Sequence, residues 1–335
     1  MCSRLREADM SLTFLAKNPT SQEMGSIMAS WQTSRRRFMV GTGAALLAAT
    51  RRGAVAETAF KTVEPGVLTI ANSNEMPMIA MEGSKLIGSD AEILATIAKR
   101  MGLGVKSAQM EWSATVQSVK SGRADIMLGN MGWTPARAQA LLITDAIYYA
   151  GAFVCMKQDK PFTTSFSVND VKGRSIGTVN GFTIVPEMKK LPGVGEVKLY
   201  DNSDGCVRDV VAGRLDFAVL DGPLVDYMIL KNPNWNLKQV PLAADPAFPQ
   251  LTSKQHTVMG MNQENFDLFD AVNAGVKWMW QTRQNAALMQ KYGISNPDYL
   301  VPPEKNPRIG VDRDAAGNVL GAGAHPTKDF SALFA

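Results

Sequence analysis

The chain has 335 residues, of which 45% are apolar and 20% are charged. This length suits about two compact domains, and the composition excludes a mainly disordered or coiled-coil protein. Residues 1–56 hold eight Lys and Arg and three acids; subtracting these from the totals of 35 and 31 leaves 27 basic and 28 acidic residues. The body of the chain is therefore near neutral and lacks the basic surplus of many nucleic-acid-binding proteins, so no nucleic-acid partner is expected.

Residues 1–56 have the pattern of an export signal. Three arginines in Ser34–Phe38 precede the apolar stretch Met39–Ala49, and the small residues Ala54–Ala56 follow. This order is typical of a secretory signal, and the paired arginines are similar to those of twin-arginine (Tat) signals. We expect cleavage after Ala56 and release into the periplasm. The alternative is a basic cap on a short buried helix.

The sequence offers little support for a metal or a disulfide. Cys155 and Cys206 are the only cysteines after the leader, and His256 and His325 are the only histidines. Their spacing matches no metal-binding pattern, so neither a metal site nor a cofactor is expected. Two buried thiols are favoured over a bridge, although the predicted compartment would permit one.

Strand and helix signals alternate after the leader, which indicates an α/β protein. The elements expected in chain order are a strand at Val67–Ala71, a helix through Ile93–Met101, an extended segment at Val105–Met110, a short helix at Val116–Lys120, strands at Ala124–Leu128 and Ser175–Val179, a helix through Val185–Lys190, a strand at Val197–Leu199, a helix from Ser203, a strand at Leu215–Leu220, and helices at Glu264–Trp280 and Arg283–Tyr292.

One short pattern occurs twice. Ser121–Ile126 (SGRADI) reappears as Ala212–Phe217 (AGRLDF), in each case with a helix ending at Gly before an apolar strand. Five residues beyond each Asp lies a polar side chain, Asn130 in the first copy and Asp221 in the second. Ligands of open α/β sheets collect beyond the carboxyl ends of strands. The repeat therefore predicts two lobes that face a shared cleft.

Two extended segments could connect these lobes. Ala146–Met156 and His256–Met261 bracket the middle of the chain, so the second lobe is expected as an insertion in the first. The tail after Pro302 lacks periodicity and is expected to be an extended arm or partly disordered. The expected division is a leader at 1–56, lobe 1 at 57–155 plus 257–300, lobe 2 at 156–256 and a C-terminal extension at 301–335.

The segment Thr134-Pro135-Ala136-Arg137 has the chemistry of a helix start with a cation in its first turn. Thr is a favoured N-cap, and Pro is favoured at the next position. The planar guanidinium of Arg137 can bind a carboxylate with two hydrogen bonds. A capped helix with a surface arginine is the equally frequent alternative.

Together these motifs resemble those of the family-3 periplasmic solute-binding proteins, which serve polar amino acid ABC transporters. The likeness covers about residues 62–292. It is carried by Leu86–Ile93, Glu111-Trp112, Ser121–Asp125, Thr134–Arg137, Thr144-Asp145 with Tyr148-Tyr149, and Val219–Asp221. The resemblance implies a type II periplasmic-binding-protein fold, in which each lobe is a central sheet flanked by helices and two hinge crossings join the lobes. It also implies a monomer that closes over an amino acid and delivers it to a permease in the inner membrane.

The resemblance assigns roles to several residues. It implies that Arg137 binds the α-carboxylate, that Asp221 binds the α-ammonium, and that Trp112 covers the ligand side chain. Thr183 would contact the carboxylate from the second lobe, although Phe182 departs from the family pattern there.

Other departures bear on the identity of the ligand. The first loop has Ser73 where the family has an acid and Met76 where it has an aromatic lid, and Gly132 replaces a hydroxyl residue beside Trp133. Asn130 could compensate for the lost hydroxyl. Without the acid, a cationic ligand side chain is less favoured. Glu75 could supply an acid, but a solvated loop glutamate is the more frequent case.

Two other functions stay open at this level. Proteins of this fold include cyclohexadienyl dehydratases, and such an enzyme would need a general acid or base in the cleft. A binding protein for an organic acid or another small solute is the second alternative, because the first loop and Gly132 depart from the family pattern.

Overall fold

The computed structural model describes residues 60–294 and 296–335, which all belong to one unit, residues 54–335. The expected signal and its cleavage site after Ala56 lie outside the described residues. Among the helices that are described, none has the length and apolar character needed to cross a membrane.

The first lobe is built on a five-stranded sheet in the order β4-β1-β5-β14-β6. Strand β1 (Val67–Asn72) pairs in parallel with β4 (Gly104–Gln109) and β5 (Ile126–Met127). Strand β14 (Gly260–Met261) lies antiparallel between β5 and β6 (Leu142–Ile143). A strand from late in the chain therefore completes the sheet that the early strands begin.

Helices pack on this sheet because each has an apolar face that is buried against it. In α1 the side chains of Ile93, Leu94 and Ile97 recur at helical spacing and are fully buried. Gly88 precedes α1 with φ 115°, and a Cβ there would lie 2.3 Å from the Met78 carbonyl oxygen, so only glycine fits. The helices of this lobe are α1 (Ser89–Arg100), α2 (Trp112–Lys120), α3 (Pro135–Ala140), α8 (Phe266–Thr282) and α9 (Gln284–Lys291).

The second lobe has its own five-stranded sheet and its own aromatic core, in which the rings of Phe166 and Phe217 meet 4.8 Å apart. Its strands, in spatial order, are β10 (Glu196–Tyr200), β9 (Ser175–Val179), β11 (Phe217–Asp221), β8 (Ala152–Lys157) and β12 (Leu237–Pro241). Its helices are α4 (Val185–Met188), α5 (Ser203–Val211), α6 (Gly222–Lys231) and α7 (Pro249–Thr252).

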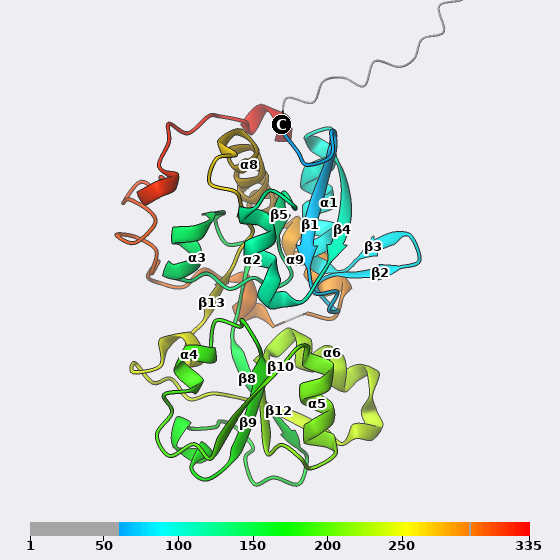
Figure 1. The fold of residues 1–335 in the computed structure, drawn as a ribbon, viewed down its shortest axis with the longest axis vertical. Coiled ribbons are helices and arrows are strands. Elements are labelled where there is room, and N and C mark those ends of the chain that lie inside the picture. Colours follow the sequence, from blue (N-terminus) through cyan, green and yellow to red (C-terminus); the bar gives the residue numbers. More distant parts are fainter. Residues whose placement is uncertain (1–59, 295) are drawn as a thin grey trace, which may run out of the picture. The chain divides into compact units, whose positions relative to one another are not determined.

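Two chain segments cross between the sheets and pair with each other. Strand β7 (Tyr148–Ala150) runs antiparallel to β13 (Gln255–Thr257), and both lie where the two sheets approach (Figure 1). Strand β7 falls within the first extended segment that the sequence predicts as a crossing, and β13 overlaps the second but begins one residue before it. The remaining short elements are the hairpin β2 (Ala80–Glu82) and β3 (Lys85–Ile87) and the 3-10 turns η1 (Val168–Val171), η2 (Pro233–Trp235), η3 (Pro297–Leu300), η4 (Gly321–Gly323) and η5 (Ser331–Phe334).

The repeated sequence pattern makes the same contact in each lobe. Asp125 accepts a hydrogen bond from the backbone N–H of Thr69 in β1, and Asp216 accepts one from Ser175 at the start of β9. Each Asp therefore ties the strand that follows the Gly turn to the parallel strand beside it, β1 in the first lobe and β9 in the second. Cys155 and Cys206 are both buried and unbridged, as the sequence favours.

The tail is irregular, as its composition predicts, but it is firmly packed and not disordered. Arg308 is 1% exposed and donates to the carbonyls of Ile143 and Thr144 at the edge of the first sheet. Its guanidinium also pairs with Asp312 at 2.9 Å. The tail therefore holds the first lobe through buried charge and not through a regular element.

This contact predicts that Arg308→Ala destabilises the protein by about 3 kcal/mol, because it removes a buried ion pair with Asp312 and two buried hydrogen bonds to the carbonyls of Ile143 and Thr144, while Arg313 keeps its own contacts with Ile143 and Asp312. Urea unfolding at neutral pH measures the change. Arg174→Ala is the control, because that side chain is 50% exposed and its ion pair with Asp216 should contribute less than about 1 kcal/mol. Equal stability of the two variants would contradict the anchoring role of the tail.

Candidate functional site

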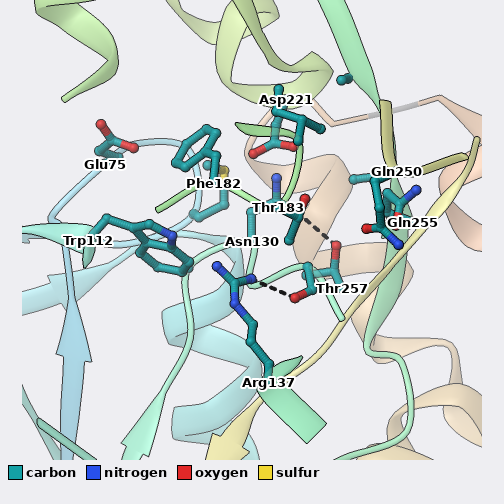
Figure 2. Close-up of a pocket in the computed structure, with 16 residues that line it drawn as sticks. Glu75, Trp112, Asn130, Arg137, Phe182, Thr183, Asp221, Gln250, Gln255 and Thr257 are labelled. Carbon is teal, nitrogen blue, oxygen red and sulfur yellow. Dashed lines mark hydrogen bonds between the residues drawn. The ribbon is translucent and has the colours of Figure 1, made fainter. Parts of the chain in front are cut away.

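A polar pocket lies where the two lobes meet, and loops from both lobes line it (Figure 2). The cavity is small, with a volume of about 20 Å³, so its walls are nearly in contact. The lining residues are Glu75, Met78, Trp112, Gly129, Asn130, Gly132, Arg137, Ala150, Ala152, Phe182, Thr183, Ile184, Asp221, Gln250, Gln255 and Thr257.

Arg137 enters the pocket from the first turn of α3. The Thr134 hydroxyl caps this turn by accepting from the Arg137 backbone N–H at 3.1 Å, as the sequence predicts. The guanidinium donates to the carbonyl of Gly132 at 2.6 Å and, across the cleft, to that of Gly181 at 2.9 Å. Burial lowers the pKa of Arg137 to about 10, so it remains a cation at neutral pH.

Asp221 approaches from the other lobe, at the end of β11. Burial raises its pKa to about 7, and the nearby Glu75 carboxylate adds to the rise, while Asn130 and Arg137 oppose it. Asp221 has no basic group within 4.0 Å among the residues that the structure describes. The pocket therefore contains a carboxylate and a guanidinium from opposite lobes that are not paired with each other.

Asn130 is held beside Asp221 by its surroundings. Its backbone takes a left-handed conformation with φ 52°, and its side-chain oxygen accepts from the Thr257 hydroxyl at 2.8 Å. Its amide nitrogen points toward Asp221 in Figure 2, and this proximity opposes the rise in the pKa of that carboxyl. Behind it, the buried carboxylate of Asp90 accepts from the Asn130 N–H and from the Tyr148 hydroxyl, both at 2.7 Å.

Trp112 and Phe182 form the aromatic side of the pocket. Trp112 is 4% exposed, and its ring meets that of Phe182 edge-on with centroids 6.3 Å apart. The Arg137 guanidinium also lies over the Trp112 ring, 5.6 Å from its centroid. The indole N–H is buried and makes no hydrogen bond within residues 60–294 and 296–335.

The structure brings together six of the eight residues selected from the sequence, namely Arg137, Asp221, Trp112, Asn130, Thr183 and Gly132. Ser73 and Met76 line a separate hollow that shares Glu75 with the pocket. Trp133 also lies elsewhere, because its indole N–H donates to Asp312 in the tail at 3.1 Å. Its bulk therefore does not fill the pocket.

Glu75 corrects another expectation. It is not a solvated loop residue: it lines the pocket, and its carboxylate accepts from the Ser203 N–H of the second lobe at 2.9 Å. Desolvation raises its pKa, and the hydrogen bond from Ser203 opposes the rise. Met78, Gln250, Gln255 and Thr257 also line the pocket without a sequence signal that selects them.

Two five-stranded sheets joined by paired crossings, with a polar pocket between them, define the type II periplasmic-binding-protein fold. Residues 68–295 match the bacterial extracellular solute-binding proteins, family 3. Because that match spans more than half of its length, the chain belongs to this family.

Known proteins with related sequences and structures agree with this class. The chain is 27% identical over 198 residues to the probable amino-acid-binding protein YxeM of Bacillus subtilis, covering 56% of this chain and 71% of that protein. It is 23% identical over 234 residues to the L-cystine-binding protein TcyJ of Escherichia coli, covering 69% and 84%.

Among solved structures, the L-arginine complex of AbpA, an amino acid ABC transporter substrate-binding protein from Streptococcus pneumoniae, aligns with a TM-score of 0.61. That alignment has 20% identity and covers 69% of this chain and 96% of the other. At this identity, the likeness supports the fold alone.

The buried position of Asp221 generates a prediction about pH. Its folded pKa of about 7 lies above the ordinary value of 3.8, so between these pH values the folded protein holds a proton that the unfolded chain has lost. The stability of the ligand-free protein therefore falls as pH rises from about 4 to 7.

Asp221→Asn should make this fall smaller, whereas the exposed Asp159→Asn change in the same lobe should leave it unchanged. Urea unfolding at several pH values measures it. The same pH dependence in Asp221→Asn and in the wild-type protein would show that Asp221 is not desolvated.

Proposed function

We propose that this protein is the substrate-binding component of an ABC transporter and that it binds an amino acid zwitterion in the cleft. The α-carboxylate binds Arg137 and the hydroxyl and N–H of Thr183, and the α-ammonium binds Asp221. A membrane permease then receives the amino acid from the closed protein. Membership of the solute-binding family supports this proposal, as do the amino-acid-binding relatives.

The observation that carries the proposal is the position of two opposite charges, one from each lobe, in the same pocket. Arg137 belongs to the first lobe and Asp221 to the second, both line one pocket, and they make no ion pair with each other. A zwitterion supplies the missing partner for each group. Because each lobe satisfies only half of the ligand, binding favours the conformation in which the lobes meet.

The proposal includes the cellular location of the protein and its oligomeric state. Export by the Tat-like leader with cleavage after Ala56 would place the protein in the periplasm, where it acts as a monomer. We assign it a binding function and no catalytic step.

Arg137→Ala and Asp221→Ala should each weaken amino acid binding by about 100-fold or more, because each change leaves a buried ligand charge unpaired. Isothermal titration calorimetry across the common amino acids measures the effect. Arg123→Ala and Asp159→Ala are controls at exposed positions and should bind as the wild-type protein does. Full affinity in either pocket variant, or no binding by the wild-type protein to any amino acid, would overturn the proposal.

Closure depends on a close approach between Gly132 and Thr183. A Cβ on Gly132 would lie 2.9 Å from the Thr183 methyl group across the cleft. Gly132→Ala should therefore hold the lobes apart and weaken binding by about tenfold or more.

Adding Thr183→Ser removes the obstructing methyl group and keeps the hydroxyl, so the double variant should recover most of the lost affinity. Stopped-flow measurement of ligand dissociation and calorimetry test both variants. If the double variant bound no better than Gly132→Ala, the contact would not limit closure.

A further inference from the structure

Trp133 joins the loop before α3 to the C-terminal tail. This loop, residues 131–134 (the α3 loop), carries the pocket residue Gly132 and leads into α3. The Trp133 side chain is 5% exposed, and its indole N–H donates to the Asp312 carboxylate at 3.1 Å. Its backbone N–H donates to the carbonyl of His256, in the crossing strand β13. The α3 loop, the tail and one crossing therefore meet at Trp133.

Asp312 is itself fixed in position. It is 5% exposed, and the Arg308 guanidinium donates to it from Nε at 3.2 Å and from Nη2 at 2.9 Å. The same guanidinium donates to the carbonyls of Ile143 and Thr144 at the end of β6. A hydrogen bond to an ionised, buried acceptor is stronger than one between neutral groups. The indole is therefore held by a strong acceptor that is anchored to the first sheet.

The α3 loop determines how Arg137 enters the pocket. The Gly132 carbonyl accepts from the Arg137 guanidinium at 2.6 Å (Figure 2), and the Thr134 hydroxyl accepts from the Arg137 backbone N–H. Trp133 lies between these two residues, so a shift of its backbone moves both contacts. A planar guanidinium binds a carboxylate with two hydrogen bonds only when it is correctly oriented. The orientation of Arg137 therefore depends on where the indole is held.

The acceptor for this indole lies outside the part of the chain that matches the family. That match ends at residue 295, whereas Arg308 and Asp312 belong to the tail. The contact between the tail and the α3 loop is therefore an addition to the matched region.

We propose that Trp133 and Asp312 are positioning residues for amino acid binding. Their hydrogen bond holds the α3 loop, and with it Arg137, in the orientation that receives the ligand carboxylate. Both side chains lie outside the pocket, so they act through Arg137. This inference rests on the proposed function and adds the C-terminal tail to the groups on which binding depends.

Trp133→Phe removes the indole N–H and keeps an aromatic ring. Calorimetry on the full chain should show an affinity about fivefold or more below that of the wild-type protein for every common amino acid that the wild-type protein binds, because the loop must then be ordered when the ligand binds. Hydrogen exchange of the ligand-free protein gives a second readout. The amides of Arg137 and Ala138, which donate to Thr134, should exchange about tenfold faster.

Phe334→Ala is the matched control for a loss of stability alone. Phe334 is a buried tail residue whose ring lies 5.7 Å from that of Trp278 in α8. This change should lower the urea midpoint of unfolding. It should leave the amino acid affinity and the exchange of the α3 amides as they are in the wild-type protein.

A double-mutant cycle tests whether the two positioning residues act through their contact. Asp312→Asn keeps an acceptor oxygen and removes the charge, so it should also weaken amino acid binding. Added to Trp133→Phe, it should weaken binding by no more than about twofold further, because the contact is already lost. If Asp312→Asn folds poorly, the result for Trp133→Phe decides.

The outcomes separate this inference from the proposed function. Wild-type affinity or unchanged exchange of the α3 amides in Trp133→Phe would overturn the positioning role, and so would full additivity in the cycle. An equal loss of affinity in Phe334→Ala would also overturn it. If the wild-type protein bound no amino acid, the proposed function would fail, and the exchange measurement would still decide whether the contact holds the α3 loop.

Discussion

Two opposite charges lie in one desolvated pocket without forming an ion pair with each other. The elements of the two lobes hold them in these positions. Arg137 extends from a capped helix of the first lobe, and Asp221 ends a strand of the second. Burial opposes the charged form of both groups. A buried charge that lacks a partner is costly. A ligand that contacts both groups therefore binds with a more favourable free energy than a ligand that contacts only one lobe. Closure around a ligand follows from this arrangement.

The groups behind the pocket hold it in place. Asp90 accepts from the backbone of Asn130 and from Tyr148, which lies in one of the two crossing strands. One buried carboxylate therefore connects a pocket loop to the hinge region. The tail also supports the pocket. Arg308 donates to the edge of the first sheet and pairs with Asp312, and Asp312 accepts from Trp133, which is next to the pocket residue Gly132.

The sequence predicts those helices, strands and pocket residues that a short local pattern encodes. The helix and strand periods place most elements within a few residues, and the GRxD repeat leads to Asn130 and Asp221. Glu75 and Trp133 could not be placed in this way. Glu75 accepts a hydrogen bond from Ser203 of the other lobe, 128 positions away, and Trp133 donates to a tail residue 179 positions away. Contacts between distant segments decide both, and no short pattern records them.

A crystal structure of the protein with the amino acid that calorimetry finds to bind best tests the central claim most directly. The account predicts the ligand carboxylate within hydrogen-bonding distance of the Arg137 guanidinium and the ammonium within the same reach of the Asp221 carboxylate. A ligand bound outside the pocket, or one whose ammonium and carboxylate both contacted a single lobe, would contradict it.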